Sequence, residues 1–276
     1  MCTANAIRPS HSAAGQQAPA ASTQSQSPPA QPAASEVKPA PPGHIFPNGV
    51  TLTYTGEWRL IHAGTATIQL SSSGAEEHVH AVADSSGAVT MLYRLRDRFD
   101  SYFDPHTFCS SRIVKHTEEG LRRRDTQIVF DYPEHQALLE ETNLRNGEKK
   151  HVPNELPACA TDVVSGIFYA ASLKLQPGAS YTFPLNDGGK TVNVTLKVQE
   201  REEVKTPAGT FQTVRVEPEA PSGVLKNKGH IWIWYTDDDQ HIPEQARAKM
   251  LWGTLTLRLT RIDKPAAAGA AGASEH

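Results

Sequence analysis

The sequence predicts a mainly β domain of the α+β class: a curved antiparallel sheet, half-barrel or barrel of about ten to twelve strands with one amphipathic helix. Apolar and polar residues alternate in many short segments, as in strands that have one buried face. Turn residues such as Asp-Pro and Asn-Gly separate these segments at intervals of about ten residues. Only residues 161–175 carry apolar side chains at helical spacing.

The alternating pattern starts at Val50, where the segment VTLTYTGEW places Val50, Leu52 and Tyr54 on one face. Further strands are predicted over residues 63–70, 78–84, 89–97, 111–118, 123–131, 136–143, 190–204, 209–220 and 229–236, from near Pro243, and over 253–262. Because short turns connect most of them, the pattern is typical of an antiparallel meander.

The predicted helix, residues 161–175, interrupts this series of strands. Thr161 or Asp162 can cap its N-terminus, and Val164 and Phe168 belong to its apolar stripe. A Pro-Gly pair follows the helix and returns the chain to strand. A single amphipathic helix in a β domain is expected to cover or plug one side of the sheet.

The two ends of the chain differ from its middle. Residues 1–43 are almost entirely Ala, Pro, Ser, Gln and Thr, and residues 264–276 repeat this composition. Such segments bury too little apolar surface to offset the entropy lost on ordering. We therefore expect one folded domain over residues 44–263, between a disordered tether and a disordered tail.

Composition argues against several classes of partner. The formal net charge of −3, from 27 basic and 30 acidic residues, gives no overall field that favours nucleic acid or an anionic membrane. No apolar run reaches the roughly eighteen residues of a transmembrane helix, so membrane contact is expected only through a lipid anchor. Motifs for nucleotide binding, zinc proteases and serine hydrolases are absent from the sequence, and no cofactor is expected.

Cys2, followed by the Ala/Pro/Ser/Gln-rich tether, matches the start of a mature bacterial lipoprotein, in which a lipidated cysteine precedes a flexible leash. The apolar segment of a signal peptide is missing from the sequence as given. Lipidation at Cys2 predicts a periplasmic, membrane-anchored protein. The alternative is that Cys2 stands there by chance, in which case an authentic start predicts a cytoplasmic protein.

Cys109 and Cys159 both fall within the predicted domain. In an oxidising periplasm they can form a disulfide. Closing a loop of this length stabilises a fold by about 3–4 kcal/mol on the chain-entropy model. Two buried free thiols are the alternative, and the sequence leaves both open.

Six motifs occur in order along the chain: FPNGVTLTYTGEWRLIHAGTATIQL, DRFDSYFDP, ATDVVSGIFYA, TPAGTFQTVRVEP, IWIWYTDDDQHIP and GTLTLRLT. Together they resemble the bacterial family catalogued as domain of unknown function 3108. The resemblance covers essentially all of residues 44–263 and implies an exported or envelope-associated β-rich protein. It implies no activity, because that family has no established catalytic or binding residues.

Asp237, Asp238 and Asp239 raise the question of a calcium site. A calcium loop needs a glycine at its sixth position and a glutamate at its twelfth, and this segment has neither there. Consecutive carboxylates in an extended chain also point to opposite sides. We therefore predict a turn between two strands.

Two other polar clusters have simpler structural explanations. Arg122 to Arg124 can bind an anion, but alternation predicts an exposed strand edge or turn. His78 and His80 share one face of a strand and can bind zinc only with a third ligand, which the sequence does not identify. No metal site is predicted.

Trp232, Trp234 and Tyr235 are the candidate ligand-binding residues. Trp232 and Trp234 share one face of a predicted strand, and Ile231 and Ile233 share the other. A strand that is apolar on both faces lies within a core or lines a cavity. The second arrangement would let these aromatic side chains stack on a sugar or a lipid.

These observations favour a non-enzymatic envelope protein that binds a lipid-like or glycan-like molecule. The alternative is a structural or assembly partner that presents a sheet edge or the arginine-rich hairpin to another envelope protein. A hydrolase that uses Asp100 and Asp104 near Tyr102 is a third hypothesis, supported only by proximity in sequence.

Overall fold

The computed structural model describes residues 35–220, 229–250 and 253–264, all within the second of two units, 1–34 and 35–276. These residues form β1 (Thr51–Trp58), β2 (Ile61–Ser73), β3 (Glu76–Ser85), α1 (Gly87–Leu92), β4 (Leu95–Phe103), β5 (Ser110–Glu119), β6 (Arg122–Asp131), β7 (Gln136–Asn143), β8 (Lys149–Glu155), α2 (Ser165–Ser172), β9 (Ser180–Asp187), β10 (Lys190–Thr206), β11 (Gly209–Glu219), β12 (His230–Thr236), β13 (Pro243–Met250) and β14 (Gly253–Asp263).

The strands form one antiparallel sheet in the order β8-β7-β6-β5-β4-β3-β2-β1-β14-β13-β12-β11-β10-β9. Two meanders, β1–β8 and β9–β14, meet where β1 pairs with β14. The predicted fold class is confirmed, with 14 strands among the described residues. The sequence pattern missed β8, which is almost wholly exposed, and predicted the return to strand after the Pro-Gly pair without bounds for β9, which contains a proline and shows no clear alternation.

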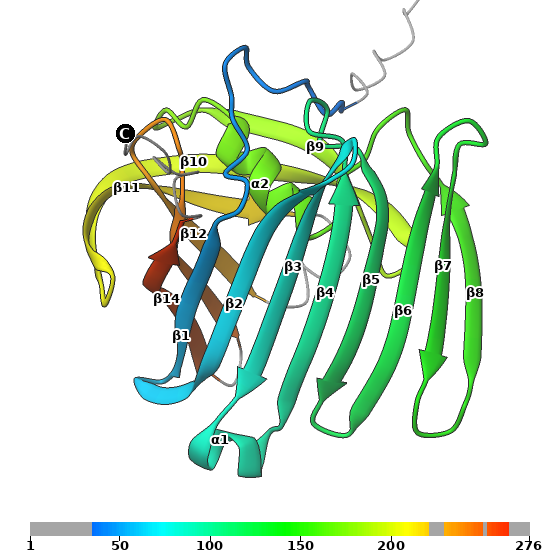
Figure 1. Ribbon diagram of the computed structural model, residues 1–276, viewed down its shortest axis with the longest axis horizontal. Helices are drawn as coiled ribbons and strands as arrows, with labels where there is room; N and C mark the ends of the chain where they lie inside the picture. Colours follow the sequence, from blue (N-terminus) through cyan, green and yellow to red (C-terminus); the bar gives the residue numbers. More distant parts are fainter. Residues whose placement is uncertain (1–34, 221–228, 251–252, 265–276) are drawn as a thin grey trace, which may run out of the picture. The chain divides into compact units, whose positions relative to one another are not determined.

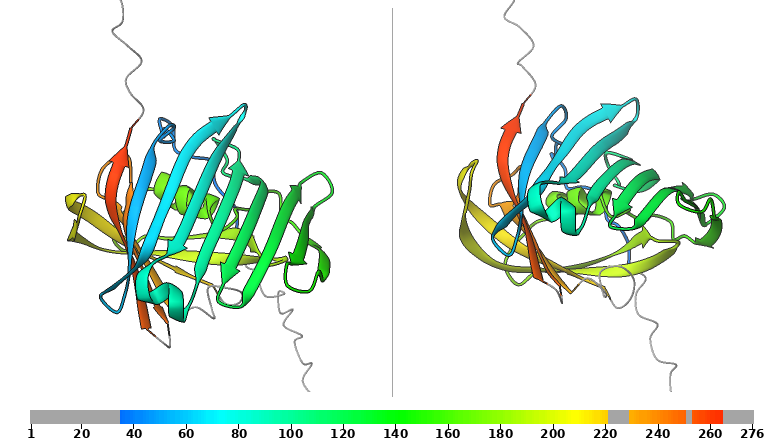
Figure 2. Two further views of the ribbon diagram at one scale, coloured as in Figure 1. Left: turned by 60° about the horizontal axis from the view of Figure 1, so that its bottom comes forward. Right: turned by 90° about the horizontal axis from the view of Figure 1, so that it is seen from below.

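The sheet curves round α2, which lies against its concave side (Figures 1 and 2). Large inward-facing side chains from the strands surround the helix. Leu52, Leu70, Val79 and Phe103 are at most 1% exposed, and Phe168 of α2 packs into the same cluster. Burial of these apolar side chains is the main stabilising contribution to this part of the fold.

Helix α2 is shorter than the predicted helix over 161–175, and it is buried on every side rather than amphipathic. Asp162 explains where it begins. One carboxylate oxygen accepts hydrogen bonds from the backbone N–H groups of Val164 (2.7 Å) and Ser165 (3.1 Å), and the other accepts from the hydroxyls of Ser101 (2.7 Å) and Ser110 (2.8 Å). The cap thereby ties the helix to β4 and β5.

Helix α1 occupies part of the predicted strand 89–97, and the strand itself begins only at Leu95. Ser85 makes the difference, because its hydroxyl accepts hydrogen bonds from the Leu95 N–H (2.9 Å) and the Thr90 hydroxyl (3.0 Å), which closes the short connection. Val89 and Leu92 lie three residues apart and face the same cavity. Helical spacing therefore suits this segment as well as strand alternation does.

The two edge strands approach each other without forming a strand ladder in the described sheet. Side chains connect this part of the sheet instead. Asn186 of β9 donates a hydrogen bond to Asn154 of β8 (2.6 Å), and the hydroxyl of Thr191, in the neighbouring β10, donates to the Glu155 backbone carbonyl of β8 (3.0 Å). The sheet is therefore an open, barrel-like structure with a polar seam.

Folded structure begins earlier than the predicted boundary at His44. Val37 is 4% exposed and belongs to the core, and the Ala40 N–H donates to the His106 carbonyl at 2.8 Å. These two contacts attach the end of the predicted tether to the domain. The remaining predicted tether, residues 1–34, and the tail from 265 onward lie outside the described residues. None of the helices that the structure describes is long and apolar enough to cross a membrane.

Candidate functional site

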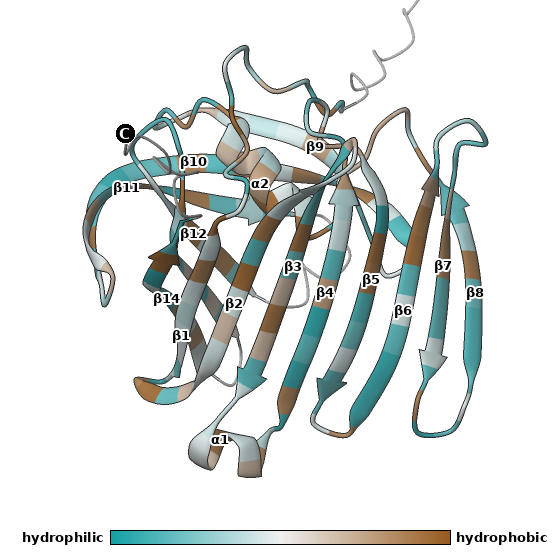
Figure 3. Ribbon diagram, viewed as in Figure 1, coloured by the Kyte–Doolittle hydropathy of each residue, from teal (hydrophilic) through white to brown (hydrophobic). Residues whose placement is uncertain are grey.

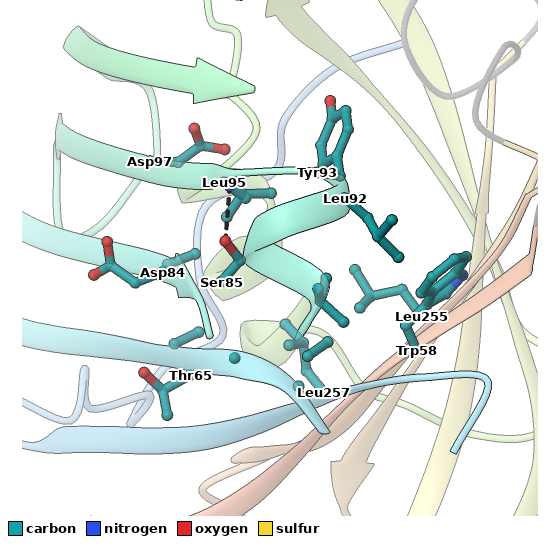
Figure 4. A pocket seen from close by; sticks show the side chains of 16 residues that line it. Trp58, Thr65, Asp84, Ser85, Leu92, Tyr93, Leu95, Asp97, Leu255 and Leu257 are labelled. Carbon is teal, nitrogen blue, oxygen red and sulfur yellow. Dashed lines mark hydrogen bonds between the residues drawn. The ribbon is translucent and has the colours of Figure 1, made fainter. Parts of the chain in front are cut away.

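The candidate site is an apolar cavity of about 610 Å³ on the concave side of the sheet. Residues of β1, β2, β3, β4 and β14 form its walls, and α1 lies at its mouth (Figure 4). Its volume falls within the roughly 300–1,000 Å³ range of small-molecule sites.

The cavity exists because side-chain size changes along the same strands. Near α2 the inward positions carry large residues, such as Leu52 of β1 and Leu70 of β2; we call this the filled half. Near α1 the corresponding strands present Gly56 and Ala66; we call this the open half. Gly64 allows β2 and β3 to approach closely in the cavity wall. A Cβ at this position would lie only 2.1 Å from the Asp84 backbone oxygen.

The mouth of the cavity is apolar as well. Leu92 of α1 lines the cavity while remaining 77% exposed, and Tyr93 beside it is 47% exposed. Figure 4 shows Leu92 pointing towards Leu255 and Trp58 on the opposite wall. An apolar ligand can therefore keep protein contacts from the interior to the opening.

The acidic residues of the wall are already engaged by the protein. The Asp97 carboxylate, in a residue 6% exposed, accepts a hydrogen bond from the Glu118 N–H at 3.2 Å. Asp84 lies 3.5 Å from Arg96 and 3.2 Å from Arg98. The cavity wall therefore offers mainly apolar contact, which suits desolvation of a hydrocarbon better than acid–base chemistry.

The structure does not bring Trp232, Trp234 and Tyr235 together on one surface. Tyr235 is fully buried, and its hydroxyl donates to the Ile167 carbonyl of α2 at 2.9 Å, so burial raises its pKa. Trp234 lies on the opposite face of β12, under Arg247, and donates to Glu202 at 2.7 Å. The face of β12 that carries Tyr235 packs in the core, whereas Trp232 and Trp234 both line a cavity on the other face.

Trp232 lies next to two shallower cavities on the outer side of the sheet. One, of about 360 Å³, includes His230, whose ring stacks on Trp232 with centroids 5.5 Å apart. The other, of about 510 Å³, is lined by Trp232, Leu60 and four basic residues, Arg59, Arg247, Lys249 and Arg258. Of the three predicted aromatic residues, Trp232 is the one that remains half-exposed.

Asp237, Asp238 and Asp239 lie in the connection between β12 and β13. Asp238 accepts hydrogen bonds from the Thr236 hydroxyl (2.7 Å) and from the backbone N–H groups of Gln240 (3.0 Å) and His241 (3.2 Å). Asp237 pairs with Arg201 at 2.7 Å. These contacts are those of a capped turn, and the part of the chain that the structure describes has no cluster of metal-ligating side chains.

His78 and His80 form a polar cluster on the outer face of β3 and β4. A ring nitrogen of each lies 2.8 Å from the same carboxylate oxygen of Asp100. Burial alone would raise the pKa of Asp100, but the hydrogen bonds to both histidines outweigh it and hold the pKa below its ordinary value. Asp104 instead caps a turn, accepting from the backbone N–H groups of His106 and Thr107, so the two aspartates have separate partners.

Arg122, Arg123 and Arg124 start β6, which lies between β5 and β7 rather than at a sheet edge. Arg123 lies 3.8 Å from Glu118, and Arg124 lies 3.3 Å from Glu141. Cross-strand ion pairs thus account for two of the three arginines.

A disulfide joins Cys109 to Cys159, with the two Cα atoms 5.1 Å apart. It connects the loop before β5 to the segment that leads into α2. Cys2, the candidate lipidation site, lies outside the described residues.

Glu244 of β13 is a buried carboxylate beside the core. It is 0% exposed, and neither of its carboxylate oxygens has a hydrogen-bond partner among the described residues. Burial, with a further contribution from the negative charge of Asp238, raises its pKa to about 7. No pattern in the sequence points to this residue, because a glutamate directly after a proline is typical of an exposed turn.

The fold and the cavity together define a class of protein: an open, curved β-sheet with an apolar, ligand-sized cavity on its concave side. Within that class, the chain belongs to the family described as Protein of unknown function (DUF3108), whose model matches residues 53–260. A comparison with curated proteins finds none that matches.

Solved structures provide a fold-level comparison. A β-barrel-like protein of domain of unknown function DUF1849 from Brucella abortus has a TM-score of 0.55 and 10% identity, over 79% of this chain and 98% of that one. A protein assigned as exported, from Bacteroides fragilis, and one assigned as a lipoprotein, from Parabacteroides distasonis, reach only 0.32 and 0.30 at 11% identity. They cover 80% and 79% of this chain and 99% and 97% of their own. Of these three, the Brucella protein is the one similar enough to show a shared fold.

Proposed function

We propose that this domain binds the acyl chain of an envelope lipid in the apolar cavity. The observation that carries the proposal is the cavity itself: about 610 Å³ of space between apolar walls, open at a mouth that is also apolar. An unfilled apolar space of this size forgoes the packing contacts that a protein core normally has. Its retention is best explained by an apolar ligand.

The magnitude of apolar transfer supports an acyl chain. Each methylene group moved from water into an apolar site contributes about 0.8 kcal/mol. A chain that buries roughly ten methylenes would gain about 8 kcal/mol before the entropic cost of binding. That gain suffices for useful affinity without any hydrogen bond to the ligand.

A glycan fits the cavity less well. A sugar must exchange its hydrogen bonds to water for hydrogen bonds to the protein, and each polar group buried without a partner costs about 1–3 kcal/mol. The acidic groups of the wall, Asp84 and Asp97, already have protein partners. The open half therefore favours hydrocarbon over carbohydrate.

The disulfide supports a location in the cell envelope. Such bonds persist in oxidising compartments and are rare in a reducing cytosol. The Cys109–Cys159 bond would therefore form after export to the periplasm. There the cavity would have access to envelope lipids.

The test is binding of cis-parinaric acid, a fluorescent fatty acid, followed by native mass spectrometry of the loaded protein. Ala83 lines the cavity, and Ala83→Phe should fill part of it and weaken binding at least tenfold. Val82→Phe is the matched control, because the neighbouring residue faces the other side of the sheet and binding should be unchanged.

Ala66→Leu provides a second, smaller filling of the cavity if Ala83→Phe does not fold. Equal binding by wild type and by a folded cavity-filled variant would contradict the proposal. The alternative function is that of an assembly partner of another envelope protein. Native mass spectrometry of protein isolated from its own membranes distinguishes the two, because an assembly protein would carry a polypeptide partner rather than a lipid.

A further inference from the structure

One end of the sheet gathers most of the exposed apolar side chains. Ten large hydrophobic residues are conspicuously exposed among those that the structure describes, and seven of them lie at the end where α1 lies. The seven are Leu60, Ile61, Met91, Leu92, Tyr93, Leu121 and Leu144. In Figure 3 the connection between β1 and β2 shows the brown of hydrophobic residues at its tip. We call these seven residues the apolar tips.

The antiparallel order explains why they share one end. The β1–β2, β3–β4, β5–β6 and β7–β8 connections all lie at the same end of the strands (Figure 1). Leu60 and Met91 are 87% and 89% exposed, and Leu121 is 78% exposed. Exposing such large apolar side chains to water is unfavourable. Their presence on several connections at one end indicates a surface that contacts a partner or a membrane.

Basic residues accompany the apolar tips. Arg59 precedes Leu60, Arg94 follows Tyr93, Arg122 follows Leu121 and Arg145 follows Leu144. The adjoining outer cavity of about 510 Å³ contains Arg59, Arg247, Lys249 and Arg258, with Glu57 as the only acidic residue in its lining. Glu119 and Glu148 stand at these connections too, and Arg94 lies 3.9 Å from Glu118, so the clear excess of positive charge at this end is the outer cavity with its four cations and one glutamate.

Apolar side chains interspersed with arginine and lysine are the chemistry of proteins that lie on an anionic bilayer. The apolar groups enter the boundary between headgroups and acyl chains, and the cations stay at the level of the phosphates. A protein partner would more often meet a polar rim around a central apolar patch. Here the cations alternate with the leucines from one connection to the next.

We propose that the apolar tips dock on an anionic lipid surface, with Leu60 and Met91 inserted and with Arg59 and Lys249 facing lipid phosphates. Docking in this orientation turns the cavity mouth, where Leu92 lies, towards the bilayer. A lipid could then pass between membrane and cavity without full exposure to water. The docking itself goes beyond the proposed function and does not require the cavity to be occupied.

The experiment is co-flotation of the disulfide-bonded protein with vesicles of phosphatidylcholine containing about 30 mol% phosphatidylglycerol, against vesicles of phosphatidylcholine alone. Wild type should bind the anionic vesicles and release as salt rises. Leu60→Ser with Met91→Ser, neither of which lines the apolar cavity, should lower binding at least tenfold. Lys249→Gln should lower it about fivefold.

Matched controls lie away from this end. Ile45 is 84% exposed outside the apolar tips, so Ile45→Ser removes a similar apolar group and should leave binding unchanged. Lys174→Gln serves in the same way for Lys249→Gln. Equal losses in controls and test variants, or unchanged binding by the tip variants, would overturn the proposal.

Two further outcomes distinguish membrane docking from ligand binding in the cavity and from binding of a protein partner. Ala83→Phe should still float with anionic vesicles even though it binds parinaric acid poorly, so failure of the ligand proposal leaves docking intact. If the tips bind no vesicles but their substitution removes a protein that co-purifies from native membranes, the surface is a protein interface and the membrane proposal is wrong.

Discussion

The filled half and the open half of the concave surface are built by many of the same strands, yet they differ in almost every physical property. In the filled half, α2 and large residues such as Phe103 exclude water completely. In the open half, Gly56, Ala66 and Ala83 leave a cavity, and α1 lies at its mouth without a single buried residue. One sheet thus carries both a stabilising core and an apolar cavity.

The difference shows how a curved sheet can keep a tightly packed core and an apolar cavity apart. Side chains that face inward along one strand need not have one size, and the register of the sheet places small residues beside small ones. Ala66 of β2 is the direct partner of Ala83 of β3, just as Leu70 is the partner of Val79. Changes in the two halves should therefore have separable effects.

The largest effect should come from the filled half. Phe103→Ala removes a fully buried ring and should lower the free energy of unfolding by about 3–5 kcal/mol. Leu92→Ala, at the exposed mouth of the open half, should change it by no more than about 0.5 kcal/mol. Urea unfolding followed by tryptophan fluorescence measures both, and similar losses would mean that the open half is packed in solution.

The disulfide should rank next. Replacing Cys109 and Cys159 together by serine should cost about 3–4 kcal/mol, because the unfolded chain loses a cross-link across 50 residues. Parinaric acid affinity of the folded variant should stay unchanged, since neither cysteine lines the cavity. Intact mass after alkylation without reductant checks the premise: two alkylated thiols in periplasmically expressed protein would show that the bond does not form.

Glu244 makes the stability of the filled half dependent on pH. Its pKa is about 7 in the folded protein against an ordinary value of 4.5, so the folded state holds the proton more tightly than the unfolded state. Stability should therefore fall as pH rises from about 4.5 to about 7, by on the order of 3 kcal/mol in total.

Glu244→Gln should remove this pH dependence, because the amide resembles the protonated acid and does not titrate. Thermal unfolding of both proteins across this range gives the comparison. Parallel stability curves for the two proteins would show that Glu244 is solvated or paired in solution.

A smaller effect is expected at the turn that follows β12. Asp238→Ala removes an acceptor for two backbone N–H groups and should cost about 1 kcal/mol. Asp238→Asn keeps a carbonyl acceptor and should cost less than half as much. Adding millimolar calcium should leave both unfolding curves in place; a calcium-dependent shift in wild type that Asp238→Asn abolishes would restore the metal hypothesis.

Much of the sheet could be predicted from the sequence, because alternation and turn residues act locally. The strand predicted over 136–143 matches β7, and that over 123–131 differs from β6 by one residue. Helix α1 was not predicted, because the spacing of its apolar residues fits both the period of a strand and that of a helix. The pairing of β1 with β14 depends on residues far apart in the chain, which no local pattern reveals.

The cavity could not be predicted from conspicuous residues, because its walls are made of glycine, alanine and leucine. Trp232 and Trp234 attracted attention through their chemistry and line an outer cavity, but neither lines the apolar cavity of about 610 Å³. Two weak signals were present in the sequence. Small residues recur at inward positions of neighbouring strands, and a leucine stands next to or near an arginine in the four connections at the α1 end of the sheet.

The pairing of β1 with β14 also determines when the cavity can form. Thr51 lies opposite Asp263, so the first and last strands meet in the middle of the sheet. Each meander can form its own hairpins from local contacts. Pairing β1 with β14 instead requires almost the entire chain, because the entropy of the very long loop between them is lost when the two strands meet. The cavity has β1 on one side of that contact and β14 on the other. The cavity therefore cannot be complete until this contact has formed, and a chain truncated before Gly253 would lack one wall of the cavity.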